Sequence, residues 1–175
     1  MINKKGAKVF LDLKFFDIPN TVAQAVRAAV RHKVKMLTLH ILGDEEMIKA
    51  AVYAAQEEAK KLKVKKPLLI GVTVLTSKEA DSSDVFTLAK MGVEFGLDGV
   101  VCSAREAKYL KDNIKKKFVI VTPGIRPAGI GSNDQKRTAT VAEAQAAGSN
   151  FLVIGRPILE AKDPLRAVEG ILREL

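Results

Sequence analysis

The sequence predicts an α/β protein in which the strands of a parallel sheet alternate with helices. Six short runs rich in Val, Ile, Leu and Phe alternate with segments whose apolar residues recur at helical spacing. The runs are continuously apolar, which is typical of parallel strands that are covered by helices. Such alternation is compatible with an open doubly wound sheet or with a (β/α)8 barrel, and six units alone do not separate the two.

The expected elements follow one another without a linker or a low-complexity segment. Asn20 or Thr21 is the expected N-cap of the first helix, because both residue types satisfy the free amides of a first turn. The expected strands are residues 9–15, 36–42, 67–75, 98–102, 118–122 and 151–154. The expected helices are residues 21–34, 44–62, 83–95, 104–114, 140–147 and 164–175.

Length and composition favour a single domain over residues 1–175. With 47% hydrophobic residues, the 175-residue chain can bury a sizeable core. No apolar run approaches the roughly 20 residues that span a bilayer, and no leader signal opens the sequence, so we expect no membrane partner. A single cysteine cannot form an internal disulfide, which favours a cytoplasmic location.

The net charge of +9 has three readings: a nucleic-acid partner, a phosphorylated metabolite or a lysine-rich solvated surface. Aromatic residues make up only 5% of the chain, Trp is absent and no nucleic-acid-binding motif occurs, so we expect no nucleic-acid partner. The densest basic run, KKLKVKK at residues 60–66, lies at the end of a predicted helix and before a predicted strand. Cations are favoured at helix C-termini, and we interpret this run as a solvated helix end.

Charged residues gather at the carboxyl end of the first strand. Asp12 and Lys14 are two positions apart and therefore project from one face, whereas the opposite face, including Leu13, is apolar. Asp17 follows at the strand end. A carboxylate and an ammonium in a sheet are costly unless they pair or have a function. The carboxyl ends of parallel strands are where the sites of such folds lie, so we expect an active site here.

Two later loops have the composition of an anion site. Residues 122–137, TPGIRPAGIGSNDQKR, carry Arg126 and Gln135, and Gly155-Arg156 directly follows the last predicted strand. A glycine amide and an arginine fork bind phosphate well, and barrels commonly hold phosphate after their last two strands. The two loops therefore predict a phosphorylated ligand.

The motifs DLKFFDIPNT, VTVLTS, DGVVCS, VTPGIRPAG, NDQKR and VIGRPI resemble orotidine 5′-phosphate decarboxylase of the bacterial type, across essentially the whole chain. The resemblance implies a TIM (β/α)8 barrel and a homodimer. Members of that family have two further strand–helix units before the one that starts near residue 9. We therefore expect six βα units of an N-terminally incomplete barrel. A shortened gene product, a second chain that completes the barrel and an oligomer of six-unit chains are the open explanations, and we favour the first.

The resemblance also implies the reaction and the residues that perform it. Orotidine 5′-phosphate would be converted to UMP and carbon dioxide without a metal or an organic cofactor. Lys14 would donate a proton to C6 of the pyrimidine, beside Asp12, and Asp17 would reach the neighbouring subunit's site together with Ile18 and Thr21. The expected substrate-binding residues in the later loops are Ser77, Pro123, Arg126, Gln135, Gly155 and Arg156.

Other functions stay open at this point. One member of the family's four-residue charge network, a lysine, and the aspartate that binds the ribose lie on the absent units, so the chain could be a non-catalytic UMP-binding remnant. Sister sugar-phosphate decarboxylases and hexulose-phosphate synthases share the D-x-K-x-x-D strand, but they use magnesium and their loops differ. His40 ends a predicted strand, and we expect a hydrogen-bonded structural histidine there.

Overall fold

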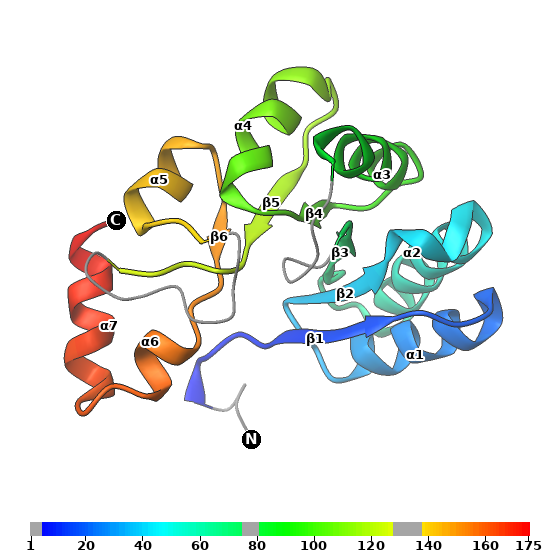
Figure 1. Ribbon diagram of the computed structural model, residues 1–175. Coiled ribbons are helices and arrows are strands. Elements are labelled where there is room, and N and C mark those ends of the chain that lie inside the picture. The colour runs from blue at the N-terminus through cyan, green and yellow to red at the C-terminus, as the bar shows by residue number, and fades with distance from the viewer. Residues whose placement is uncertain (1–4, 75–80, 128–137) are drawn as a thin grey trace. The chain divides into compact units, whose positions relative to one another are not determined.

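The computed structural model describes residues 5–74, 81–127 and 138–175 (Figure 1). The chain forms two compact units. The first comprises Met1–Thr73 and Thr87–Val100, and the second comprises Val74–Phe86 and Val101–Leu175. Within the described ranges, no helix has the length and apolar character that a membrane crossing requires.

The first unit begins with parallel strands joined by helices, as the sequence predicts. Its elements are β1 (Phe10–Phe15), α1 (Pro19–Arg31), β2 (Met36–His40), the short 3₁₀ helix η2 (Ile41–Gly43), α2 (Asp44–Leu62), β3 (Leu68–Val72), and most of α3 (Ser82–Glu94) and β4 (Gly99–Val101). Strand β2 lies between β1 and β3 and pairs in parallel with both. Parallel pairing brings the carboxyl ends of β1 and β2 to the same edge.

Large apolar side chains fill the centre of this unit. Leu37 and Leu39 of β2 are completely buried, as is Ile41 at the start of η2. Gly71 of β3 lies against this cluster, and a Cβ atom there would come within 2.6 Å of the Ile41 and Leu97 side chains. The close packing at β3 therefore requires a glycine.

Helices α1 and α2 pack side by side against the strands (Figure 1). Arg27 of α1 pairs with Glu57 of α2 at 2.6 Å, and Arg31 pairs with Glu58 at 2.7 Å. The hydrogen bond from Arg31 lowers the pKa of Glu58, against the opposing effect of burial. Charged pairs thus join the two helices, and one of the paired carboxylates, Glu58, is buried.

The second unit repeats the alternation of strands and helices. Its elements are α4 (Ala104–Asn113), β5 (Val119–Thr122), α5 (Val141–Ala146), β6 (Phe151–Leu152), α6 (Arg156–Leu159) and α7 (Pro164–Arg173). Strands β5 and β6 are parallel, with Val121 opposite Phe151. Asn150 supports the pair before β6 begins, because its Oδ1 accepts the Ile120 amide at 2.8 Å.

A small apolar cluster supports the loop that follows β5. Ile125 is completely buried against Val141 and Ala144 of α5 and Ile171 of α7. Helix α5 is fixed at its start by a capping box, in which Thr140 Oγ1 accepts the Glu143 amide and the Glu143 carboxylate accepts the Thr140 amide. The chain around Arg126 is therefore held by a packed core.

Several local predictions were wrong. Helix α1 begins at Pro19 with Ile18 as its N-cap, and neither Asn20 nor Thr21 caps it, because a proline preset for helical φ starts the first turn. The strand expected at residues 36–42 ends at His40, and η2 replaces its last two residues. The helical turn α6 was not expected.

Candidate functional site

The carboxyl end of β1 brings Asp12 and Lys14 together, as their spacing predicts. Lys14 Nζ donates to Asp12 Oδ2 at 2.6 Å. The side chains are 36% and 47% exposed for Lys14 and Asp12 respectively. An ion pair this exposed contributes at most about 1 kcal/mol to folding stability. Stability therefore does not explain why these charges lie at a strand end.

Thr38 of β2 holds both members of the pair. Its Oγ1 donates to Asp12 Oδ1 at 2.8 Å and accepts the Lys14 amide at 2.9 Å, and the residue is completely buried. Thr38 is not among the site residues predicted from the sequence. The sequence does contain one clue, because Thr38 is the single hydroxyl residue in the otherwise apolar run MLTLH. It is two positions before His40 and therefore lies on the same face of the strand.

The backbone of β1 departs from a regular strand at this point. Leu11 lies opposite Leu37 and Phe15 opposite Leu39, so four residue steps on β1 match two on β2. Lys14 has a φ of +52°, a left-handed conformation that costs a residue with a Cβ atom roughly 1–2 kcal/mol. The predicted apolar face fails here, because the irregularity leaves Leu13 62% exposed. Such irregularities re-aim side chains beside active sites.

His40 lies at the end of β2, close to the pair. Its Nδ1 is buried and has no hydrogen-bond partner among the described residues, so the expected hydrogen-bonded histidine is not found. The Phe16 ring lies 5.5 Å from the imidazole, centroid to centroid. Burial lowers the pKa of His40 from its ordinary 6.5, and the positive charge of Lys14 lowers it further.

The His40 titration gives a direct test of this geometry. We expect its midpoint below 6.5 by NMR, and an upward shift in Lys14→Ala, because one of the two causes is removed while burial stays. Lys49→Ala on α2 is the matched control and should leave the midpoint unchanged. As the pH falls through 6.5, the unfolded chain takes up this proton first, so His40 makes folding less favourable on acidification. An unshifted midpoint in Lys14→Ala would contradict the arrangement.

The turn from β1 into α1 exposes the next group of predicted residues. Asp17 Oδ1 accepts the Ile18 amide at 2.7 Å, which orders the turn before Pro19. Asp17, Ile18 and Thr21 are all exposed. A hollow of about 320 Å³ lies here, lined by Phe16, Asp17, Ile18, Pro19, Leu42, Gly43 and Asp44.

In the second unit, Arg126 is placed just after β5. Its amide donates to the Ala139 carbonyl at 2.9 Å, and its side chain is buried, with the residue only 6% exposed. Nη1 donates to the Ile125 carbonyl at 3.0 Å, whereas Nη2 has no partner in the described part of the chain. A buried guanidinium with an unused donor is costly unless an anion occupies it. Pro123 is half-buried on the same loop.

Gly155 and Arg156 follow β6. Gly155 is the N-cap of α6, and its carbonyl accepts the amides of Ile158 and Leu159 at 2.9 and 3.0 Å. A Cβ atom on Gly155 would meet nothing within 4 Å. Packing therefore does not require a glycine here, and the open space leaves its backbone accessible to a ligand. Arg156 is half-buried.

Ser77 and Gln135, the two other predicted substrate-binding residues, lie outside the described residues. Asp12, Lys14, Asp17, Ile18 and Thr21 belong to the first unit. Pro123, Arg126, Gly155 and Arg156 belong to the second. The described ranges contain no cluster of three or more His, Cys, Asp or Glu side chains that could hold a metal ion.

Comparison with known proteins agrees with the resemblance seen in the motifs. The profile of the orotidine 5′-phosphate decarboxylase / HUMPS family matches residues 1–171. The chain is 46% identical over 187 aligned residues to orotidine 5′-phosphate decarboxylase of Moorella thermoacetica, covering 100% of this chain and 74% of the relative. The enzyme of the same name from Hydrogenovibrio crunogenus is 49% identical, with 95% and 73% covered.

Solved structures give the same result. The crystal structure of orotidine 5′-phosphate decarboxylase from Lactobacillus acidophilus matches with a TM-score of 0.85 and 38% identity, over 99% of this chain and 77% of that one. The Thermotoga maritima enzyme of that name matches with a TM-score of 0.74 and 27% identity, over 98% and 76%. These matches confirm the predicted TIM-barrel fold class with six βα units. The chain belongs to the orotidine 5′-phosphate decarboxylase / HUMPS family.

Proposed function

We propose that this chain catalyses the decarboxylation of orotidine 5′-phosphate to UMP, a reaction of de novo pyrimidine biosynthesis. The observation that carries the proposal is the Asp12–Lys14 pair, held by Thr38 at the carboxyl ends of two parallel strands. The single cysteine and the reaction both fit a cytoplasmic enzyme.

The Lys14 ammonium and the Asp12 carboxylate each have one role in the proposed reaction. The bond between C6 and the carboxylate breaks, carbon dioxide leaves, and the electron pair stays on C6. The Lys14 ammonium stabilises that developing charge and transfers its proton to C6, after which water returns a proton to the amine. Asp12, 2.6 Å from Lys14 Nζ, pairs with the ammonium group, and in this proposal it lies beside the departing carboxylate. No metal or organic cofactor takes part in these steps.

Substrate phosphate binding is assigned to the loops of the second unit. The unused Nη2 donor of Arg126, the accessible backbone of Gly155 and the guanidinium of Arg156 supply the donors that a phosphate dianion needs. Pro123 shapes the same loop, and Gln135 completes the phosphate assignment by its place in the motifs. Ser77 is assigned to the pyrimidine on the same ground. Phosphate binding far from C6 can orient the pyrimidine at the reacting centre, which raises the rate.

We further propose a homodimer in which Asp17, Ile18 and Thr21 reach the partner's site. The support is the exposed apolar surface around them: Phe16 is 61% exposed, Ile18 68% and Leu42 62%. Adjacent exposed apolar side chains around a hollow mark protein interfaces.

Ile18→Glu tests the dimer. A charge in this patch should raise the dimer dissociation constant by about tenfold or more, measured by sedimentation velocity, because the carboxylate would be desolvated on association. Leu159→Glu is the matched control, since Leu159 is an even more exposed leucine, at 79%, in the other unit. Equal dissociation in both variants would place the interface elsewhere.

The function itself is tested by following the ultraviolet absorbance of orotidine 5′-phosphate during incubation with the chain. We expect conversion to UMP that is unchanged by EDTA. Loss of activity on chelation would instead indicate the magnesium chemistry of the sister sugar-phosphate enzymes. Binding of UMP without conversion of orotidine 5′-phosphate would contradict the proposed activity.

A further inference from the structure

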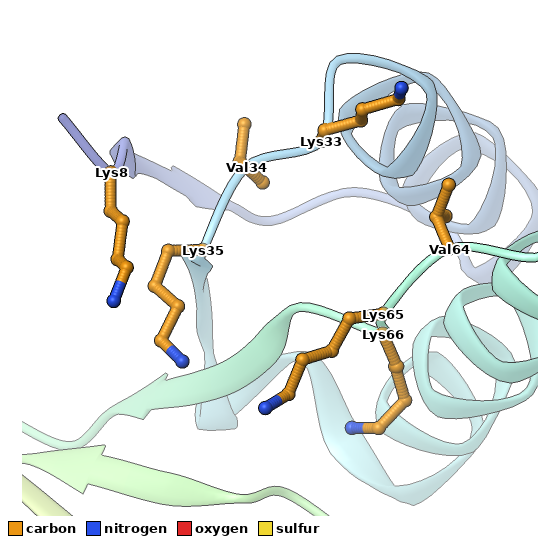
Figure 2. A pocket seen from close by; sticks show the side chains of 7 residues that line it. All are labelled: Lys8, Lys33, Val34, Lys35, Val64, Lys65 and Lys66. Atoms are coloured by element: carbon orange, nitrogen blue, oxygen red, sulfur yellow. The ribbon is translucent and has the colours of Figure 1, made fainter. Parts of the chain in front are cut away.

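A second pocket lies at the opposite end of the strands in the first unit. It has a volume of about 480 Å³ and is lined by Lys8, Lys33, Val34, Lys35, Val64, Lys65 and Lys66 (Figure 2). Lys8 precedes β1, Lys35 directly precedes β2, and Lys66 precedes β3. The pocket is therefore at the amino ends of these strands, whereas Asp12 and Lys14 are at a carboxyl end. Its volume is within the range of ligand sites, roughly 300–1,000 Å³.

Four of the lysines extend to the same side. Figure 2 shows the side chains of Lys8, Lys35, Lys65 and Lys66 running in one direction, while Lys33 extends away. Lys66 Nζ is paired with Asp98, whose Oδ2 also accepts the Leu69 amide. In the described part of the chain, no carboxylate lies within ion-pair distance of the other three ammonium groups on that side.

Helix dipoles do not balance this charge. The C-termini of α1 and α2 lead into the two loops that line the pocket, and each carries a partial charge of about −0.5. Together they offset roughly one of the three positive charges that have no carboxylate partner among the described residues. The sequence-based interpretation of the basic run as a solvated helix end therefore accounts for only part of the charge, and Lys8 and Lys35 lie outside that run.

The lining residues indicate what kind of anion would bind. Every charged group in the lining is a lysine, which binds phosphate as a point charge without the fork that matches a carboxylate. Among the described residues, no aromatic side chain lines the pocket, so they offer no surface on which a base could stack. Val34 and Val64 add only small apolar contacts. Several clustered charges favour linked phosphates over a single one.

We propose that this lysine pocket binds a polyphosphate anion, a chain of two or three linked phosphates, either free or carried by a nucleotide. The site is separate from the Asp12–Lys14 pair and does not depend on the reaction proposed for it. Because the lysines would contact only the phosphates, the dissociation constants of free tripolyphosphate and a nucleoside triphosphate should agree within about threefold.

Isothermal titration calorimetry with tripolyphosphate tests the proposal. The double variant Lys35→Ala/Lys65→Ala should weaken binding by about tenfold or more, because two charge-assisted contacts are lost. Lys60→Ala/Lys61→Ala removes the same charge from exposed positions of α2 outside the pocket and should change affinity less than about twofold. Arg156→Ala changes the proposed substrate-phosphate loops of the second unit and not the lysine pocket. It should therefore leave tripolyphosphate binding intact.

Any one of three results would overturn the proposal. These are an absence of tripolyphosphate binding to the unmodified chain, equal weakening in both lysine double variants, and loss of binding in Arg156→Ala. Orthophosphate that binds as tightly as tripolyphosphate would also overturn it. Thermal unfolding of each variant checks the fold, and Lys35→Gln/Lys65→Gln repeats the test with longer side chains.

Discussion

Replacing Lys14 with alanine is expected to lower kcat for orotidine 5′-phosphate by roughly 10⁴-fold or more, while UMP still binds. In the proposed mechanism, the variant removes both the proton that C6 receives and the cation beside the developing charge. Lys14→Arg should be nearly as inactive, because a guanidinium keeps the charge but does not give up its proton. Kinetics by absorbance and UMP binding by calorimetry measure the two properties separately.

The same variant should fold almost as well as the unmodified chain. The Asp12–Lys14 pair is too exposed to contribute more than about 1 kcal/mol, and alanine removes none of the buried apolar contacts of β2. Lys49→Ala, which removes an exposed lysine paired with Glu45 on α2, is the control for a lost surface charge. A Lys14→Ala protein that retained more than about one per cent of its turnover would exclude Lys14 as the proton donor.

The pairing of Asp12 with Lys14 could be predicted from the sequence because side chains on a strand alternate with a period of two. The exposure of Leu13 could not. It depends on the irregular register between β1 and β2, which is set by the residues of β2 that pair with the backbone of β1. Local alternation carries no information about a partner strand 24 residues away, such as the bond from the Lys14 amide to Thr38.

Helix α1 shows the same division between local and non-local information. Its existence follows from apolar residues at helical spacing, and Val22 and Val26 are indeed buried. Its first residue depends on Pro19, which can begin a helix without an N-cap side chain. The phosphate-loop motifs predicted Arg126 as a ligand, but only the structure shows that its Nη2 is buried without a partner among the described residues.

Thr38 is a site residue that the structure reveals and the sequence motifs do not. Thr38→Val tests its role in holding Asp12 and Lys14. The variant is expected to lower kcat by about 10- to 100-fold, because Asp12 loses the hydroxyl that orients it and Lys14 loses the acceptor that holds its backbone. A buried amide left unsatisfied should also lower the free energy of unfolding by about 1–3 kcal/mol. The KM should change little, since the phosphate loops are untouched.

Thr38→Ser separates the hydroxyl from the shape of the side chain. Serine keeps the oxygen that links Asp12 to the Lys14 amide and loses only a methyl group, so it should recover most of the turnover lost in Thr38→Val. A serine variant as slow as the valine variant would mean that packing of the methyl group, and not the hydrogen bonds, matters at this position. Recovery of kcat in serine would instead show that β2 orients the charged pair of β1 through one hydroxyl group.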